Sequence, residues 1–312
     1  MPSCFVSSSS PSSALTSPSS GAAPVLRPCT RPRLVFTDLD GSLLDHDSYD
    51  WAPAAAWLTA LKAAGVAVVP VTSKTRSELL PLRLELGLGD TPFIAENGAV
   101  IALPPSWCHA KLESPGPDGL VIKTLGVDIG LIRRRIGIWR ERLSTSFLTM
   151  SEMALEDVVA FTGLDDQQAR LARLREGSEP LVWDDDEALL ERFREGLAGD
   201  GLRMTQGGRF WHVLGDVDKG RAVTWLVGRF AALRGTTPET LALGDGPNDI
   251  GMLEAVDQAV VIRGAHRLTV RPRQAALYRS QASGPRGWAE GLSHCWGEPA
   301  AREGREPREG EA

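Results

Sequence analysis

Short apolar runs alternate with amphipathic stretches along the first third of the chain. Runs of strand length and stretches of helical spacing predict, in order, strand 34–36, helix 54–64, strand 66–71, helix 76–86 and strand 91–95. Gly65 and Gly87 stand directly after the two helical stretches, where glycine commonly ends a helix. Strands that are joined through helices predict a parallel sheet with right-handed crossovers.

The pattern changes after Pro104 and Pro105, and the first pattern returns at Lys219. The middle region predicts strand 120–125, helices 129–143, 153–161 and 167–175, strand 181–183, helix 187–197 and strands 202–205 and 210–214. The final region predicts helix 219–233, strand 240–243, helix 248–255 and strand 259–262. We therefore predict an α/β fold: a doubly wound parallel-sheet (Rossmann-like) core with an inserted α+β cap domain.

The expected core spans residues 33–104 and 209–296, and the expected cap spans residues 105–208. Residues 1–32 are rich in Ser, Pro and Thr, and they lack the basic region and continuous apolar stretch of a secretory signal. Residues 297–312 are rich in Glu, Arg, Gly and Pro. We predict that both terminal segments are disordered tails.

Composition narrows the classes of partner. Hydrophobic residues make up 42% of the 312 residues, which is enough for a sizeable core, and no apolar run is long enough to span a bilayer. The formal net charge of −6 disfavours binding to nucleic acid and requires that basic residues gather locally around any anionic substrate. The scattered cysteines Cys4, Cys29, Cys108 and Cys295 suggest neither a zinc site nor a disulfide framework. We expect a cytoplasmic protein with no membrane partner, and its oligomeric state stays open.

Two carboxylates two residues apart follow the first strand. Asp38 and Asp40 stand before the turn residue Gly41, at the carboxyl end of a strand, where open α/β sheets bind ligands. Alternation along the strand places both side chains on one side. One carboxylate can attack while the other transfers a proton, and both can help to hold a divalent cation.

Three later segments complete a set of groups suited to phosphate chemistry. Strand 66–71 ends at Thr72 and Ser73, Lys219 opens a helix, and strand 240–243 leads into a turn that contains Asp245 and Asp249. The order supplies a nucleophile, a hydroxyl and a cation for phosphate, and an acidic metal cluster. It resembles the four motifs of the haloacid dehalogenase superfamily of phosphatases.

These residues take distinct roles in phosphoryl transfer. We expect Asp38 to be the nucleophile, Asp40 the general acid and base, and Thr72 (or Ser73) and Lys219 the groups that hold the phosphate oxygens. The candidate ligands of a Mg²⁺ ion are Asp38, Asp40 through its backbone carbonyl, Asp245 and, from the second layer, Asp249.

Further segments resemble one family within that superfamily, mannosyl-3-phosphoglycerate phosphatase. They are Val71-Thr72-Ser73-Lys74-Thr75-Arg76, Ile94-Ala95-Glu96-Asn97-Gly98, Ser178-Glu179-Pro180 and Gly207-Gly208-Arg209-Phe210-Trp211-His212. The resemblance covers residues 33–264 and implies hydrolysis of 2-O-mannosyl-3-phosphoglycerate, an anionic sugar phosphate, to mannosylglycerate, which is a compatible solute.

Four residues are candidates for substrate binding: Arg209, Glu96, Asn97 and Ser178. A guanidinium at Arg209 can grip the glycerate carboxylate through two parallel bonds, and Glu96 can accept hydrogen bonds from sugar hydroxyls. The structural alternatives are a surface partner for nearby acids at Arg209, a turn at Glu96 and Asn97, and a helix cap at Ser178. His212, on a strand, is expected to be a structural histidine.

Other functions stay open at this point. The same core suits a phosphatase of glucosyl-3-phosphoglycerate or sucrose phosphate, or a phosphomannomutase-like enzyme. A non-catalytic binding protein on a phosphatase fold would be expected to lack Asp38 or Asp40, and both are present.

Overall fold

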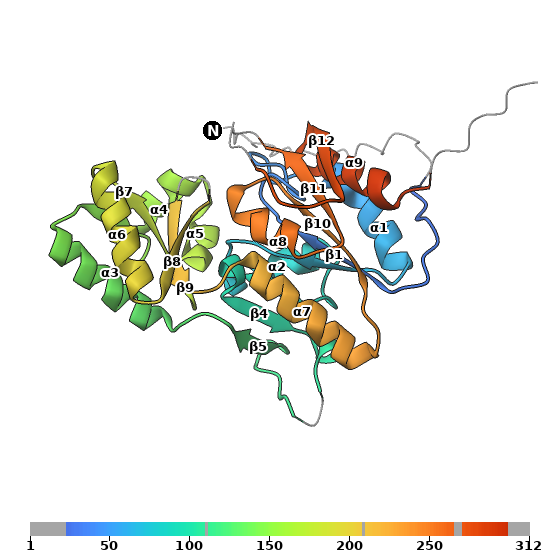
Figure 1. The fold of residues 1–312 in the computed structure, drawn as a ribbon, viewed down its shortest axis with the longest axis horizontal. Helices are drawn as coiled ribbons and strands as arrows, with labels where there is room; N and C mark the ends of the chain where they lie inside the picture. The colour runs from blue at the N-terminus through green and yellow to red at the C-terminus, as the bar shows by residue number, and fades with distance from the viewer. Residues whose placement is uncertain (1–22, 110–111, 208–209, 265–269, 299–312) are drawn as a thin grey trace, which may run out of the picture.

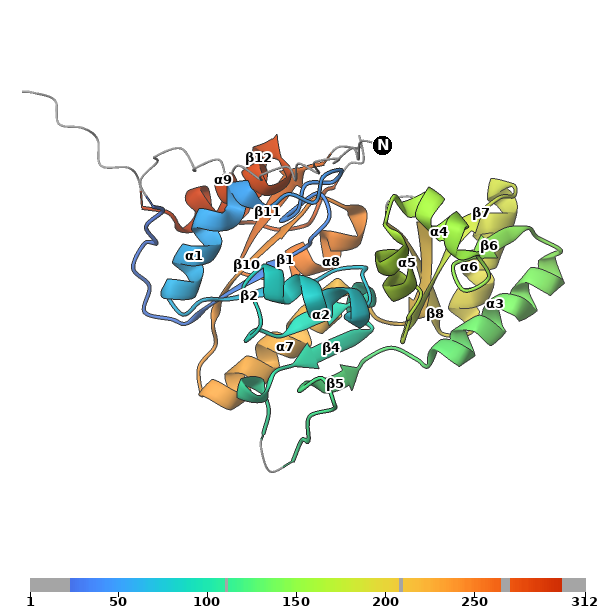
Figure 2. The same ribbon diagram turned by 180° about the vertical axis from the view of Figure 1, so that it is seen from behind.

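The computed structural model describes residues 23–109, 112–207, 210–264 and 270–298. Two lobes lie side by side, joined by the segment that follows β5 and the one that follows β9 (Figure 1). The reverse view shows the same separation, with α1 and α9 on the far side of the larger lobe from the smaller one (Figure 2). The larger lobe is the predicted core and the smaller lobe is the predicted cap.

A five-stranded parallel sheet forms the centre of the core. Its order is β12 (Leu277–Ser283), β11 (Gln258–Arg263), β10 (Glu239–Gly244), β1 (Arg33–Thr37) and β2 (Ala67–Pro70). Strands β1 and β10 are neighbours although about 200 residues separate them in the chain. The carboxyl ends of β1 and β10 therefore meet at one edge of the sheet, as the doubly wound prediction requires.

Helices cover both faces of this sheet because side chains alternate along each strand. Val35 faces one hydrophobic cluster, and Leu34 and Phe36 face the other. The first cluster receives α1 (Ala55–Ala63), α2 (Arg76–Glu85) and α9 (Gly284–Trp296), and the second receives α7 (Lys219–Arg234) and α8 (Ile250–Glu254). The Rossmann-like core is thus confirmed.

A second, antiparallel sheet continues the core beyond β2. It consists of β3 (Phe93–Ala95), β4 (Val100–Leu103) and β5 (Val121–Thr124), and a parallel bridge between Val71 and Ile94 links it to the end of β2. Short 3₁₀ turns occur at η1 (Ala52–Ala54), η2 (Glu96–Gly98), η3 (Pro105–Trp107) and η4 (Pro247–Asp249). The turn η2 follows β3 directly and lies on the cap-facing side of the core.

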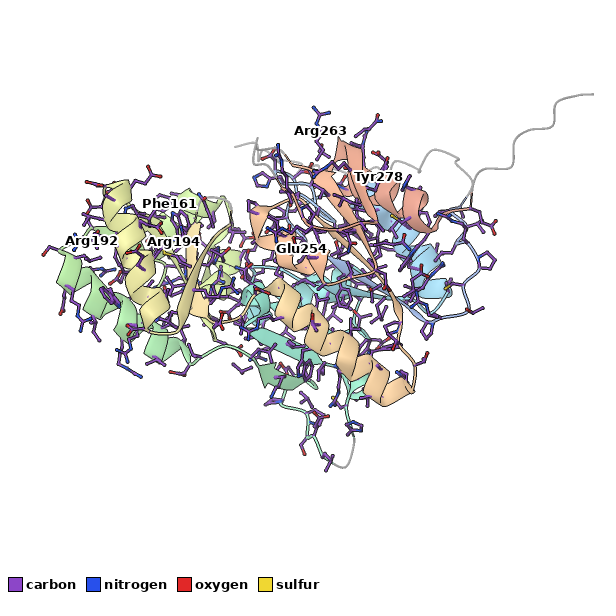
Figure 3. All side chains as sticks on the ribbon, viewed as in Figure 1. Phe161, Arg192, Arg194, Glu254, Arg263 and Tyr278 are labelled. Atoms are coloured by element: carbon purple, nitrogen blue, oxygen red, sulfur yellow. The ribbon has the colours of Figure 1, made fainter. Side chains whose placement is uncertain are left out.

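The cap is an antiparallel sheet with helices on both faces. Its strand order is β6 (Phe147–Thr149), β7 (Ser178–Trp183), β9 (Phe210–Gly215) and β8 (Leu202–Gly207). Helices α3 (Ile129–Leu143) and α6 (Glu187–Gly199) pack on one face, and α4 (Leu155–Thr162) and α5 (Asp166–Ala172) pack near the other. In α6, Phe193 is fully buried while Arg192 and Arg194 project outward (Figure 3). The predicted α+β character of the cap is confirmed.

The strand pairing cuts across the predicted domain boundaries. Residues 121–124 were assigned to the cap, but β5 pairs with β4 in the core lobe. Residues 210–214 were assigned to the core, but β9 pairs with β7 and β8. The domain boundaries at 105 and 208 stay predictions. In the strand pairing, the chain passes from one lobe to the other near residues 126 and 216.

The helices and the cysteines bear on two expectations that were drawn from composition. Within the described ranges, none of the helices has both the length and the apolar character needed to cross a bilayer. Of the four cysteines, Cys29, Cys108 and Cys295 are free thiols, and Cys4 lies outside the described residues.

Trp288 anchors α9 to the central sheet, and its removal should weaken the core. The indole is fully buried, and its Nε1 donates a hydrogen bond to Oγ1 of Thr37, at the end of β1, over 2.9 Å. We expect Trp288→Ala to lower the free energy of unfolding by about 3–5 kcal/mol, the usual cost of a large buried cavity. Chemical denaturation measures it, with Leu84→Ala, whose side chain is exposed, as the control. Equal losses in the two variants would contradict the assigned role.

Candidate active site

The turn after β1 brings Asp38 and Asp40 to the edge of the sheet. The backbone N–H of Asp38 donates to the carbonyl of Leu243 in β10 over 2.9 Å, so the ladder continues up to the acidic residue. Gly41 follows with φ +80°, and a Cβ at this position would lie 2.6 Å from Oδ2 of Asp245. Glycine is therefore required both for the turn and for the close approach of the two acidic loops.

Three carboxylates meet at this edge. Oxygen atoms of Asp38, Asp245 and Asp249 lie within 4.8 Å of one another. Asp245 and Asp249 follow β10, whose parallel pairing with β1 puts both strand ends together. The side chain of Asp40, the remaining predicted ligand, is not part of this group.

Lys219 lies beneath the carboxylates as a buried cation. Its Nζ is 2.6 Å from Oδ1 of Asp38 and 2.6 Å from Oδ1 of Asp249, and its side chain is fully buried. Burial alone would lower the pKa of Lys219, but the charges of Asp249 and Asp38 outweigh it and raise the pKa. Lys219 is thus a fixed positive charge between the predicted nucleophile and the acidic turn.

Asp249 is held by several groups of the protein. Besides Lys219, it accepts hydrogen bonds at Oδ2 from the backbone N–H groups of Asp245, over 3.0 Å, and Gly246, over 2.9 Å. A Cβ at Gly244 would lie 2.6 Å from its carboxyl carbon, so the turn is closely packed. These bonds suit Asp249 to orient the turn and leave Asp38 and Asp245 with freer oxygens.

The clustered charges fit a hard divalent cation. Burial, and then the charge of Asp249, raises the pKa of Asp245 to about 7, and burial raises the pKa of Asp38 despite Lys219. Carboxylates crowded in this way repel one another, and Lys219 alone does not neutralise them, so a bound cation would stabilise their ionised forms. An all-oxygen donor set of this kind suits Mg²⁺.

Asp40 is fixed by a lysine that sequence reasoning left without a role. Nζ of Lys74 is 2.9 Å from Oδ2 of Asp40, and the other oxygen, Oδ1, is buried with no hydrogen-bond partner among the described residues. Burial would lower the pKa of Lys74, but Asp40 and Glu78 raise it. The signal available in the sequence was the position of Lys74, two residues after Thr72 at the end of a strand.

Thr72 and Ser73 occupy different surroundings. Thr72 is 1% exposed, and its Oγ1 accepts a hydrogen bond from the backbone N–H of Lys74 over 3.2 Å. Ser73 is a lining residue of the cavity described below, and Thr72 is not. Of the two hydroxyls considered for the phosphate, Ser73 thus has direct access to the cavity.

Glu96 and Ser178 meet each other and do not line the cavity. Glu96 is fully buried with φ 51°, and its carboxylate accepts hydrogen bonds from the backbone N–H groups of Glu176 (2.8 Å) and Gly177 (3.1 Å) and from Oγ of Ser178 (2.7 Å). The predicted contact with sugar hydroxyls would require these bonds to break. The arrangement instead ties the turn after β3 to the first residues of β7, which joins the core to the cap.

Asn97 and Arg209 complete the predicted substrate residues. Asn97 has φ 55° and accepts a hydrogen bond at Oδ1 from Nδ2 of Asn248, a cavity residue, over 3.1 Å. Its own Nδ2 is buried without a partner in the described part of the chain. Arg209 lies outside the described residues.

A cavity of about 430 Å³ separates the core from the cap above the acidic cluster. Its core side includes Asp38, Asp40, Ser73, Lys74, Asp245 and Asn248. Its cap side includes Met150, Phe161, Leu164, Arg175, Phe210 and His212. Of these cap residues only His212 was given a role from the sequence, as a structural histidine, because only the placement of the cap brings them to the site.

Comparisons with known proteins agree with this arrangement. The family model for haloacid dehalogenase-like hydrolases matches residues 35–109, and the model for sucrose-6F-phosphate phosphohydrolase matches residues 115–296. The second match alone spans more than half of the chain.

Solved structures of similar fold include three phosphatases. A haloacid dehalogenase superfamily phosphatase from Bacteroides thetaiotaomicron is 18% identical, with 88% of this chain and 98% of the other covered and a TM-score of 0.61. A subclass IIB sugar phosphatase is 16% identical (84% and 98% covered, TM-score 0.59). The sucrose-phosphatase from Synechocystis sp., solved with sucrose and phosphate, is 17% identical (85% and 98% covered, TM-score 0.53). At these identities the likeness shows a shared fold alone.

Proposed function

The chain belongs to the sucrose-6F-phosphate phosphohydrolase family of haloacid dehalogenase-like hydrolases, and we propose that it hydrolyses an anionic sugar phosphate through an aspartyl-phosphate intermediate. The observation that carries this proposal is the position of Asp38. Its carboxylate lies at the edge of the sheet, facing the cavity, next to Lys219 and the acidic turn. A carboxylate so placed suits in-line attack on a phosphate monoester.

The reaction needs two proton transfers, and Asp40 is suited to both. An oxygen of Asp38 attacks phosphorus, the bond to the sugar oxygen breaks, and Asp40 protonates the departing alkoxide. Asp40 then takes a proton from a water molecule that attacks phosphorus and releases Asp38 and inorganic phosphate. Lys74 holds one oxygen of Asp40, so the other can point toward the reacting atoms.

The site would take Mg²⁺ as its cofactor. Asp38, Asp245 and the backbone carbonyl of Asp40 would hold the ion, and Asp249 would orient the turn from behind. When bound, the ion supplies positive charge that offsets the repulsion between a carboxylate nucleophile and a phosphate dianion. Ser73 or Thr72, together with Lys219, would hold the phosphate oxygens.

For the substrate we propose mannosyl-3-phosphoglycerate, because the four segments quoted in the sequence analysis resemble the phosphatases of that compound. The product would be mannosylglycerate, a compatible solute, made in the cytoplasm. Sucrose phosphate is the second candidate, and the family match over residues 115–296 favours it. Glu96 and Ser178 would support either substrate indirectly, by fixing the junction between core and cap.

A phosphate-release screen separates these candidates. Purified protein with Mg²⁺ would be assayed against mannosyl- and glucosyl-3-phosphoglycerate, sucrose 6-phosphate, hexose phosphates and p-nitrophenyl phosphate. We expect the highest kcat/KM for mannosyl-3-phosphoglycerate and slow turnover of simple hexose phosphates. A higher kcat/KM for sucrose 6-phosphate would replace the first candidate with the second. Transfer of phosphate between sugar positions without release would indicate a phosphomutase.

A further inference from the structure

The cap wall of the cavity carries two polar side chains that the proposed reaction does not use. Arg175 lies in the loop between α5 and β7, and His212 lies on β9. Both line the same cavity as Asp38 and Asp245. The two side chains thus lie on the cap wall of one cavity, opposite the acidic cluster.

Main-chain carbonyls hold the guanidinium of Arg175 in place. Its Nε donates to the carbonyl of Ala172 over 2.9 Å, and its Nη1 donates to the carbonyl of Ser73 over 2.8 Å. The second bond crosses from the cap to the loop after β2. The side chain is thus oriented without being neutralised, because a carbonyl carries no net charge.

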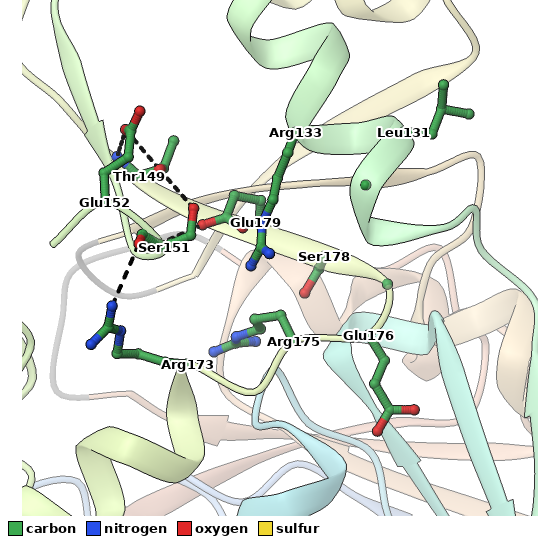
Figure 4. Close-up of polar contacts among 12 residues, drawn as sticks. Leu131, Arg133, Thr149, Ser151, Glu152, Arg173, Arg175, Glu176, Ser178 and Glu179 are labelled. Atoms are coloured by element: carbon green, nitrogen blue, oxygen red, sulfur yellow. Dashed lines mark hydrogen bonds and ion pairs between the residues drawn. The ribbon is translucent and has the colours of Figure 1, made fainter.

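The acidic residues nearest to Arg175 in sequence have other partners. Glu176 pairs with Arg76 over 2.7 Å, and the buried Glu179 pairs with Arg133 over 2.6 Å. Figure 4 shows Glu176 and Glu179 on either side of Ser178, with Arg175 joined to neither of them. Across the described residues, Arg175 has no carboxylate partner.

The two lysines of the site are already paired. Lys74 is bonded to Asp40, and the buried Lys219 is bonded to Asp38 and Asp249. Arg175 is therefore the lining cation that remains available to an anion, and it lies on the cap side, opposite the catalytic carboxylates.

His212 offers a hydrogen-bond acceptor in the same cavity. The residue is 5% exposed, and its Nδ1 has no hydrogen-bond partner in the part of the chain that the structure describes. Burial, with the charges of Arg175 and Lys219, lowers the pKa of His212 to about 3. The imidazole is thus neutral near pH 7, and a ligand hydroxyl would satisfy an otherwise costly buried polar atom. The expectation that His212 is a satisfied structural histidine was wrong on this point.

We propose that Arg175 and His212 form a cap-side subsite for the part of the substrate beyond the phosphate. Arg175 pairs with a carboxylate, and His212 accepts a hydrogen bond from a hydroxyl, which is the free 2-hydroxyl in a glycerate phosphate and a sugar hydroxyl in the 2-O-mannosyl compound. The inference rests on the proposed function and narrows it: the substrate class becomes phosphates of hydroxy acids such as glycerate, with or without an attached sugar. It assigns the carboxylate to Arg175, whereas the sequence pointed to Arg209, which lies outside the described residues.

A pair of probes that differ in the carboxylate tests the subsite. 3-Phosphoglycerate and glycerol 3-phosphate share a phosphate and a hydroxyl, and only the first has a carboxylate. Their binding would be measured by calorimetry with Mg²⁺ present, on the full-length Asp38→Asn protein so that neither is turned over. Arg175→Gln, which keeps a donor for the Ser73 carbonyl, should weaken 3-phosphoglycerate by about tenfold or more and glycerol 3-phosphate by less than about threefold.

Two further variants complete the design. Arg173→Gln is the matched control, because Arg173 stands on the same loop, bonds to the carbonyl of Ser151 over 3.5 Å and does not line the cavity. His212→Gln should weaken both probes by a similar factor, since both carry the hydroxyl. If Arg175→Gln fails to fold, Arg175→Lys keeps the charge and should retain part of the preference for 3-phosphoglycerate.

The outcomes separate this inference from the proposed function. Equal losses of both probes in Arg175→Gln, no preference for 3-phosphoglycerate in the parent protein, or no binding of it at millimolar concentration would each overturn the subsite. The proposed function is tested apart from it, by phosphate release from p-nitrophenyl phosphate, which has no carboxylate. Wild-type protein that fails to hydrolyse this substrate, yet binds 3-phosphoglycerate through Arg175, would refute the reaction and retain the subsite.

Discussion

Replacing Asp38 with Asn should reduce phosphate release by several orders of magnitude, on the scale seen when a catalytic nucleophile is removed. The amide keeps the shape of the side chain but removes the charge that attacks phosphorus. Single-turnover and steady-state assays of phosphate release, with Mg²⁺ in excess, measure the loss. Near-normal turnover by pure Asp38→Asn protein would exclude a covalent intermediate on this residue.

The fold should survive this substitution. Burial and two neighbouring carboxylates raise the pKa of Asp38, so the folded protein already disfavours its ionised form. Lys219 keeps its second partner, Asp249, over 2.6 Å. We therefore expect the Tm of Asp38→Asn to equal or exceed that of the wild type. Asp184→Asn, on the exposed surface of the cap, serves as the control that changes neither activity nor Tm.

The acidic site was predictable from sequence because its geometry is local to strand ends. Asp38 and Asp245 each follow an apolar strand, and parallel strands end at the same edge of a sheet. The helix at 129–143 was likewise predicted with the bounds that the structure gives to α3, since its apolar positions keep helical spacing.

The last strand and helix of the core were missed for a different reason. Helix α9 contains Gly284, Gly287 and Gly291, and glycine disfavours helices. A Cβ at Gly291 would lie 2.6 Å from Cγ1 of Val260, so this glycine lets the helix approach the sheet closely. That advantage depends on tertiary packing, and the spacing of residues in α9 gives no sign of it.

The substrate residues show the same limit. Glu96 and Ser178 were chosen because they stand in segments that resemble a sugar-phosphate phosphatase, but nothing in those segments shows that the two residues bond to each other. Arg175 and His212 reach the cavity only because the cap folds over the core. The sequence could predict that a carboxylate lies at a strand end, but contacts between two lobes depend on how the lobes are placed.

Removal of divalent cations should abolish activity, and Mg²⁺ should restore it. Lys219 alone does not offset the repulsion between Asp38 and a phosphate dianion, because it is already bonded to two carboxylates. Asp245→Asn should raise the Mg²⁺ concentration for half-maximal activity by about tenfold or more, the scale expected when a ligand to a metal is weakened. Full activity in excess chelator would exclude the metal-dependent mechanism.

Asp249→Asn and Asp245→Asn should differ in Tm, and the pH dependence of the Tm rise on adding Mg²⁺ should identify the direct ligand. Asp249 accepts hydrogen bonds from two backbone N–H groups of its own turn as well as from the fully buried Lys219, so Asp249→Asn should lower Tm strongly, whereas Asp245→Asn should not. The pKa of Asp245 is raised from 3.8 to about 7, so in the metal-free protein its contribution to stability is fully present below pH 3.8 and is lost as pH rises toward 7. Mg²⁺ binds the ionised form of Asp245, so its binding restores the stability that is lost when Asp245 ionises. The rise in Tm on adding Mg²⁺ should therefore grow between pH 6 and 8 in the wild type and depend less on pH in Asp245→Asn, where Asp38 is the remaining carboxylate ligand with a raised pKa. An equal pH dependence in both proteins would show that another group binds the cation.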